Sequence, residues 1–180
     1  MILIDNLRFL SLCLALTCLA RPAWHFGSRS WTTWRAASCW IAGKSQNPEA
    51  EPEHGDSALW LSIDAIGLDA VVLYGDGEDN LSRAPVLHRD TGRVILISAH
   101  RDTHFKHLGN LKSGDDIVIE DRSGGERRYR VYGAETCDPA AAVARVHDSR
   151  DANILVLMTC YPFRYIGPAP DRFLVWAERV

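Results

Sequence analysis

Two side chains of the kind used in acyl transfer stand at the ends of two apolar segments. Cys160 follows the run 154–159 (Ile-Leu-Val-Leu-Met-Thr), and His100 follows the run 94–99 (Val-Ile-Leu-Ile-Ser-Ala). Short apolar runs of this length are typical of strands buried on both faces. A thiol that attacks a carbonyl and an imidazole that protonates the leaving amine form a cysteine acyl-transfer site. The competing interpretation is that Cys160 is a small core residue, as most lone cysteines are.

A third candidate is Arg172, at the start of the last apolar run of the chain. Pro162 cannot extend a strand ladder, so the strand ends at or just after Cys160, and the loop 161–170 brings the last strand back beside it. The permanent charge and planar fork of an arginine suit the negative charge that develops on a carbonyl oxygen. The residues alone leave a surface salt bridge, for instance with Asp171, as the other interpretation.

His100 has a metal-binding alternative. His100, His104 and His107 fall at i, i+4 and i+7, and three imidazoles can hold zinc. However, an apolar strand runs directly up to His100, so this residue precedes the helix expected in the next segment, and no glutamate stands beside the histidines as in a zinc-protease helix. We therefore expect no metal. His88 and His147 lie in loop-like or polar segments and are expected to be solvated.

The chemistry-bearing residues are expected on a mostly β scaffold. The pattern predicts strands at 59–63 and 65–74, a hairpin of 116–120 and 126–136 around 123–125, and strands that end at 99, 159 and 180. Short helical segments are expected at 140–146 and from Asp102 or Thr103 to Leu108 or Leu111, with a solvated acidic loop at 75–80. Seven to eight short strands with few helices favour a closed or nearly closed barrel.

Length and composition limit the rest. A chain of 180 residues favours a single folded domain, and a net charge of −3 gives no indication of a nucleic-acid partner. The five cysteines are an odd number and show no disulfide framework, so Cys160 is expected to be a free thiol.

The N-terminal part is expected to lie outside the catalytic domain. Between Arg8 and Arg21 stand 12 uncharged residues, which as a helix would span about 18 Å, less than the hydrocarbon core of a bilayer. This length fits the apolar region of a signal peptide, and also a membrane anchor if the flanking arginines reach to the interface. A buried helix is the third interpretation. We expect an anchor or signal segment with a tryptophan-rich flank at 1–45, an acidic linker at 46–56 and the folded domain at 57–180.

Three of these segments together resemble a known family. The segments 98–105 (Ser-Ala-His-Arg-Asp-Thr-His-Phe) and 159–163 (Thr-Cys-Tyr-Pro-Phe), with Arg172, resemble the sortases, cysteine transpeptidases that cut sorting signals of the LPxTG type. The resemblance extends over residues 59–180 and is strongest to the sortase group of Gram-negative bacteria. It implies an eight-stranded barrel with the site at one end.

The resemblance also implies roles for individual residues. Cys160 would be the nucleophile, His100 the proton donor and acceptor, and Arg172 the group that holds the substrate carbonyl, while Thr159 is expected to contact substrate. The implied reaction cleaves a secreted protein between Thr and Gly and transfers it to an amine, without a cofactor. Sortases usually keep an uncleaved N-terminal anchor, which places the catalytic domain outside the cytoplasm. A cysteine endopeptidase would use the same residues, and a non-catalytic peptide-binding barrel would need Cys160 to be inert.

Overall fold

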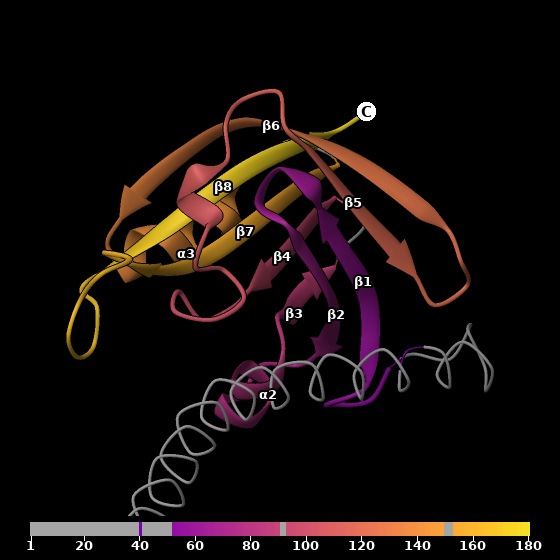
Figure 1. Cartoon of the computed structure of the whole chain (residues 1–180), viewed down its shortest axis with the longest axis horizontal. Helices are drawn as coiled ribbons and strands as arrows, with labels where there is room; N and C mark the ends of the chain where they lie inside the picture. Colours follow the sequence, from indigo (N-terminus) through magenta and orange to yellow (C-terminus); the bar gives the residue numbers. More distant parts are fainter. Residues whose placement is uncertain (1–39, 41–51, 91–92, 150–152) are drawn as a thin grey trace, which may run out of the picture. The chain divides into compact units, whose positions relative to one another are not determined.

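The computed structural model describes residues 40, 52–90, 93–149 and 153–180, and within them eight strands close into a barrel (Figure 1). The order around the barrel is β1-β2-β3-β4-β7-β8-β6-β5. The closed, mostly β barrel predicted from the sequence is therefore confirmed. The strands are β1 (Ser57–Ile63), β2 (Leu68–Tyr74), β3 (Val86–Asp90), β4 (Val94–Ser98), β5 (Asp116–Asp121), β6 (Glu126–Cys137), β7 (Ile154–Tyr161) and β8 (Asp171–Arg179).

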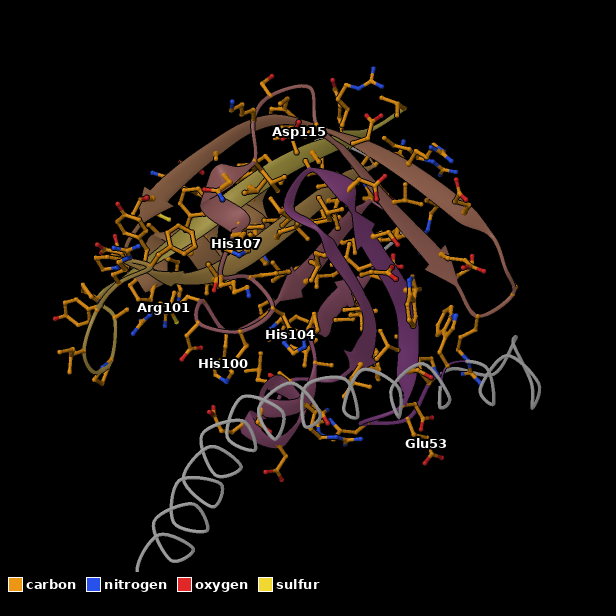
Figure 2. All side chains as sticks on the ribbon, viewed as in Figure 1. Glu53, His100, Arg101, His104, His107 and Asp115 are labelled. Atoms are coloured by element: carbon orange, nitrogen blue, oxygen red, sulfur yellow. The ribbon has the colours of Figure 1, made fainter. Side chains whose placement is uncertain are left out.

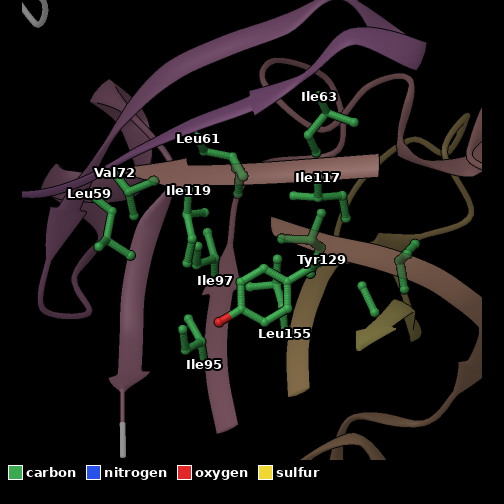
Figure 3. Close-up of a cluster of buried hydrophobic side chains, with 14 of the residues drawn as sticks. Leu59, Leu61, Ile63, Val72, Ile95, Ile97, Ile117, Ile119, Tyr129 and Leu155 are labelled. Carbon is green, nitrogen blue, oxygen red and sulfur yellow. The ribbon is translucent and has the colours of Figure 1, made fainter. Parts of the chain in front are cut away.

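The inner faces of the strands form the main hydrophobic core (Figure 3). Successive side chains of a strand point to opposite faces, so the core side chains of a strand come from alternate positions. On β7 these residues are Leu155 and Leu157, both with no exposed surface. The inner core also contains Leu59, Leu61, Ile63, Val72, Ile95, Ile97, Ile117, Ile119, Tyr129, Val131 and Val175.

The outer face of β4, β7 and β8 is covered as well. Helix α3 (Pro139–Asp148) packs there through Ala142 and Val146, and we call this second group of buried residues the outer cluster. It contains Val94, Ala142, Val146, Ile154, Val156 and Leu174, with Leu96, Cys137, Met158 and Trp176 packed against it. Because β7 is buried on both faces, its sequence is a continuous apolar run without alternation.

Strands β4 and β7 are parallel neighbours, although 55 residues separate Ser98 from Ile154 in the numbering of the chain, and β5, β6 and α3 lie between them. Helix α3 ends this crossover. Its N-cap residue Asp138 accepts a hydrogen bond from the backbone N–H of Ala141 at 2.9 Å, and Pro139 occupies the first turn. Both features stabilise a helix start, so the predicted helical segment at 140–146 is confirmed.

Three local predictions need correction. The strand expected at 65–74 begins only at Leu68, because a 3₁₀ turn, η1 (Asp64–Ile66), precedes it and Gly67 adopts a left-handed conformation with φ 61°. The acidic loop at 75–80 contains the start of helix α2 (Glu78–Arg83).

The helix expected after His100 is instead a series of turns that ends in a 3₁₀ helix, η2 (Leu108–Asn110). Phe105 and Leu108 are both fully buried there, and their burial draws the segment into the end of the barrel.

Trp40 packs against the barrel, although it precedes β1 by 17 positions in the sequence. This side chain is 5% exposed and packs beside Trp60 (ring centroids 6.1 Å apart) with Val71, Leu73 and Ala84. The other predictions for 1–45 and 46–56, including the anchor or signal segment, lie outside the described residues, except for Pro52 to Asp56. In the described part of the chain, no helix is long and apolar enough to cross a membrane.

Candidate active site

Cys160 and Arg172 are direct partners in the antiparallel ladder of β7 and β8. Directly paired residues point to the same face of a sheet, with Cβ atoms about 5 Å apart. Met158 and Leu174, two residues away on the same strands, belong to the outer cluster or pack against it. The thiol of Cys160 and the side chain of Arg172 therefore lie on the outer face of the barrel, at the end of the two strands.

His100 follows the neighbouring strand, two residues after the end of β4. The parallel register pairs Ser98 of β4 with Met158 of β7, and a further hydrogen bond runs from Ala99 N to Met158 O at 3.3 Å. His100 is the second residue after the paired Ser98, and Cys160 is the second residue after the paired Met158, so the parallel register directs both segments to the same end of the barrel. Cys160 and Arg172 thus form a row across β7 and β8, and His100 follows the neighbouring β4.

Thr159 connects the segment of His100 to the strand of Cys160. It is 2% exposed, and its hydroxyl donates a hydrogen bond to the carbonyl oxygen of Ala99 at 2.7 Å. This bond fixes the residue before His100 against the residue before Cys160. The sequence prediction that Thr159 contacts substrate remains a prediction, while the buried hydrogen bond gives Thr159 a positioning role.

The guanidinium of Arg172 is held by its own loop. Its Nη1 donates to the backbone carbonyls of Asp171 (3.0 Å) and Ala169 (3.4 Å). The alternative considered from the sequence was an ion pair with the carboxylate of Asp171. Among the ion pairs found between described residues, none includes Arg172. The backbone contacts orient the arginine without neutralising its charge.

A second cysteine continues the row on the other side of Arg172. Cys137 of β6 pairs directly with Arg172 in the β6–β8 ladder, and both Cys137 and Cys160 are free thiols. Burial, assisted by the negative charges of Asp138 and Asp171, raises the pKa of the Cys137 thiol. Cys137 is therefore kept in the protonated, weakly nucleophilic form. No sequence pattern predicts that Cys137 lies beside Arg172.

Glu78 is a second residue that the sequence did not assign to the site. Its Oε1 lies 3.7 Å from Nε2 of His100, with side-chain exposures of 84% for Glu78 and 35% for His100. Glu78 is the first residue of α2, and this helix is anchored by the buried Asn80, which donates to the carbonyls of Tyr74 and Gly75. An exposed pair of this kind contributes little energy.

The other histidines of the β4–β5 loop do not assemble into a metal site (Figure 2). Burial, with a smaller contribution from the charge of His100, lowers the pKa of His104. Within the ranges that the structure describes, no three His, Cys, Asp or Glu side chains lie close enough together to hold a metal ion. The arrangement of His100, His104 and His107 therefore does not support the zinc alternative.

His88 is not in a loop, contrary to the sequence prediction. It lies in β3, where its Nε2 is hydrogen-bonded to Oγ of the buried Ser98 at 2.5 Å. Burial lowers the pKa of His88, and the charge of Asp76 partly opposes this effect. The prediction for His147 is confirmed, because it is exposed on α3 beside Asp148.

Aromatic side chains from the residues that follow Cys160 and Arg172 pack together at this end of the barrel. Phe163 contacts Phe173 and Tyr161 with ring centroids 5.3 and 5.7 Å apart, and Tyr161 stacks on Phe173 at 6.1 Å. Phe163 and Phe173 also pack against the inner core. The loop that joins Cys160 to Arg172 is therefore anchored in the core at both of its ends.

Comparison with known proteins finds one family for most of the chain. Residues 61–180 match the family described as Sortase domain. Sortase D of Bacillus subtilis (strain 168) is 30% identical over 138 residues, which cover 72% of this chain and 67% of that protein. The comparison does not test the narrower resemblance to the Gram-negative group, which stays a prediction.

Solved structures show the same fold. A Clostridium perfringens Sortase D5 transpeptidase matches with a TM-score of 0.65 at 19% identity, over 84% of this chain and 97% of that one. The catalytic domain of B. anthracis SrtD matches with a TM-score of 0.59 at 26% identity, over 76% of this chain and 95% of that one. These likenesses agree with the closed eight-stranded barrel.

Proposed function

The chain belongs to the sortase family, and from this membership we propose that it cleaves an LPxTG-like sorting signal between Thr and Gly and transfers the acyl part to an amine. The family consists of cysteine transpeptidases that process sorting signals of secreted proteins. The motif, the bond cleaved and the acceptor are the parts that we propose for this chain. Cys160, His100 and Arg172 are the residues that we assign to the reaction.

The first half-reaction forms a thioester. The thiolate of Cys160 attacks the carbonyl carbon of the threonine, which makes the C–S bond and places a negative charge on the carbonyl oxygen. When the C–N bond breaks, His100 as imidazolium gives its proton to the departing glycine amine. Arg172, directly opposite Cys160, provides the positive charge that faces the oxygen.

The second half-reaction returns the enzyme to its starting state. The nitrogen of an incoming amine attacks the thioester carbonyl, and the neutral His100 takes the proton that this nitrogen loses. The C–S bond then breaks, which releases the thiolate of Cys160 and leaves a new amide. If water attacks instead, the same residues produce a free carboxylic acid. Transfer and hydrolysis therefore differ in the nucleophile and not in the catalytic groups.

One observation supports this proposal more than any other: Cys160 and Arg172 are direct cross-strand partners, and His100 follows the strand that pairs with β7 in parallel. These residues come from three separate segments of the chain. The side chains of Cys160 and Arg172 share the outer face, and the hydrogen bond from Thr159 to Ala99 holds the His100 segment to β7. A rigid arrangement of nucleophile, proton donor and oxyanion partner is what acyl transfer requires.

The test is a reaction of the full chain with a peptide that contains an LPxTG sequence. Mass spectrometry should show a mass increase on Cys160 equal to the acyl fragment, and none in Cys160→Ala. Added triglycine should convert the product from the free acid to the amide. Cys137→Ala is the matched control, and it should form the thioester as the wild type does. An adduct on Cys137 in the wild type would refute the assignment of the nucleophile.

We also propose that the N-terminal segment anchors the protein in the cell membrane with the catalytic domain on the extracytoplasmic side. The support is the apolar run 9–20 and the family's action on secreted proteins. Fractionation of cells, followed by protease treatment of intact spheroplasts, tests this proposal. A protein that is found in the soluble fraction, or that is protected from the protease, would contradict it.

A further inference from the structure

Arg101, the residue after His100, contacts the loop that joins the strands of Cys160 and Arg172. Its Nη2 donates to the backbone carbonyls of Tyr165 (2.9 Å) and Gly167 (3.1 Å). Its guanidinium carbon also lies 6.0 Å from the ring centroid of Tyr165. Figure 2 labels Arg101 and His100 on neighbouring positions of the β4–β5 loop. Hydrogen bonds from a charged donor are roughly twice as strong as neutral ones.

The same two loops meet at a second point. A Cβ atom on Gly109 would lie 2.6 Å from Cε2 of Phe163, a distance that real Cβ atoms do not adopt. The ring of Phe163 therefore packs where a side chain at position 109 would stand. This close approach and the Arg101 bonds together dock the loop 162–170 against the segment 101–111.

These contacts hold His100 on both sides. Before it, Ala99 accepts the hydrogen bond of Thr159 on β7. After it, Arg101 binds the loop that follows β7. The same loop also contains Ala169, whose carbonyl accepts a hydrogen bond from Arg172. The position of this one loop therefore affects His100 through Arg101 and the guanidinium of Arg172 through Ala169.

We propose that Arg101 is a positioning residue, which sets His100 relative to Cys160 and Arg172 by docking the loop 162–170. This inference rests on the proposed function for its catalytic consequence, but its structural part does not. Arg101 does not touch the reacting atoms in this scheme. A displacement of about 1 Å in a catalytic group can cost about 10²-fold in rate, so the loss of the docking contacts is expected to slow the reaction without unfolding the protein.

The test compares Arg101→Ala, Arg101→Lys and the control Arg164→Ala in the full chain. Arg164 is an exposed arginine in the same loop, so its replacement removes equal charge without removing the docking contacts. With an LPxTG peptide, Arg101→Ala should lower kcat for thioester formation by about 10- to 100-fold with a smaller change in KM. Arg101→Lys should recover part of the loss, because one ammonium keeps the charge and reaches one carbonyl but lacks the fork. Arg164→Ala should stay within about threefold of the wild type, as surface substitutions do.

A second measurement does not depend on the peptide. The imidazole NMR resonances of His100 should shift in Arg101→Ala and remain at their wild-type positions in Arg164→Ala. Gly109→Ala disrupts the close approach to Phe163, the second point at which the two loops meet. It should therefore also shift the His100 resonances.

The outcomes separate the two proposals. If the wild type forms the thioester and Arg101→Ala forms it equally fast, the positioning role is overturned and the proposed function stands. If the wild type forms no thioester, the proposed function fails. The NMR result then decides the positioning role by itself: shifted His100 resonances in Arg101→Ala support it, and unchanged resonances overturn it.

Discussion

Arg172 has a cysteine as its direct cross-strand partner on each side, Cys160 on β7 and Cys137 on β6. The two thiols are therefore on the same face and at the same level, with one guanidinium between them. Burial, together with the negative charges of Asp138 and Asp171, raises the pKa of the Cys137 thiol. Cys137 is thus disfavoured as a nucleophile although it lies beside the same guanidinium.

The first prediction concerns this second cysteine. Cys137→Ala should keep at least about half of the wild-type activity, and Cys137 should react slowly with iodoacetamide near neutral pH, because its raised pKa keeps it protonated. Peptide mapping after timed alkylation measures the labelling of each cysteine, and the label on Cys137 should grow as the pH is raised above 9. Rapid labelling of Cys137 at pH 7 would show that its thiolate is not suppressed.

The second prediction concerns Thr159. Thr159→Val keeps the shape but leaves the carbonyl of Ala99 without the hydroxyl that it accepts from, which should destabilise the protein by about 1–3 kcal/mol. It should also lower kcat, because the residue before His100 loses its tie to β7. Urea unfolding and peptide kinetics measure the two effects, and Thr159→Ser is the control that restores the hydroxyl. A variant with normal stability and kcat but a raised KM would show instead that Thr159 contacts substrate.

Part of this site can be predicted from the sequence, because a strand that is buried on both faces has a recognisable apolar pattern. Strand β7 is apolar without alternation since it is covered by the inner core on one face and by α3 on the other. Such a run, ended by Pro162, locates Cys160 at a strand end, and the same reasoning locates His100. The register that pairs Cys160 with Arg172 cannot be predicted in this way, because it depends on which strands are neighbours, and composition does not identify them.

The remaining residues of the site were missed for similar physical reasons. Glu78 and Arg101 act through single polar contacts to segments 22 and more than 60 residues away. The acidic stretch at 75–80 has the composition of a solvated loop, and this composition does not reveal the hydrogen bonds by which the buried Asn80 ties the start of α2 to Tyr74 and Gly75. His88 was assigned to a loop because its neighbours are polar, whereas it lies in β3 at an irregularity of the β3–β4 ladder, where its ring is hydrogen-bonded to the side chain of Ser98.

The third prediction is a loss of stability in acid that depends on His88. Its pKa in the folded protein lies below the ordinary value of 6.5, so between these two values the unfolded chain binds more protons than the folded one. The free energy of unfolding should therefore fall as the pH decreases through and below 6.5. Urea unfolding at pH 7.5 and 5.5 measures this change, which should be smaller in His88→Gln.

His104 contributes to the same acid sensitivity, since its pKa is lowered too. His104→Gln should reduce the change as well, and His147→Gln, at an exposed position on α3, is the control that should leave it as it is. Equal losses in the wild type and in both His88→Gln and His104→Gln would show that neither histidine is responsible.

The fourth prediction concerns the N-terminal boundary of the domain. From the sequence we expect a protein that starts at Ser57 to fold and to cleave peptide, because residues 1–56 contain no catalytic candidate. Trp40, however, packs on Trp60, Val71 and Leu73, so this truncation should lower the free energy of unfolding by about 3–5 kcal/mol. Trp40→Ala in the full chain is the matched comparison. Equal stability of the wild type and Trp40→Ala would show that this packing is not significant.

The last prediction concerns Arg172. If its guanidinium faces the carbonyl oxygen, Arg172→Ala should lower turnover by about 10²–10³-fold, which corresponds to about 3–4 kcal/mol of lost transition-state stabilisation. Arg172→Lys keeps the charge but cannot reproduce the fork, of which one nitrogen, Nη1, binds the carbonyls of Asp171 and Ala169. It should recover only part of the loss. Steady-state kinetics with an LPxTG peptide give both values.

The comparison needs proteins of equal stability, because Arg172 also holds its loop through those two backbone carbonyls. Melting temperatures and the circular dichroism of the variants provide this check. Arg179→Ala, at the exposed far end of β8, and Arg164→Ala, in the exposed part of the loop, are the controls that remove one positive charge elsewhere. Both should stay within a few-fold of the wild type. If Arg172→Ala keeps nearly full activity while Arg164→Ala is inactive, the charge that faces the oxyanion comes from Arg164, and the loop 162–170 must fold inward over Cys160 during the reaction.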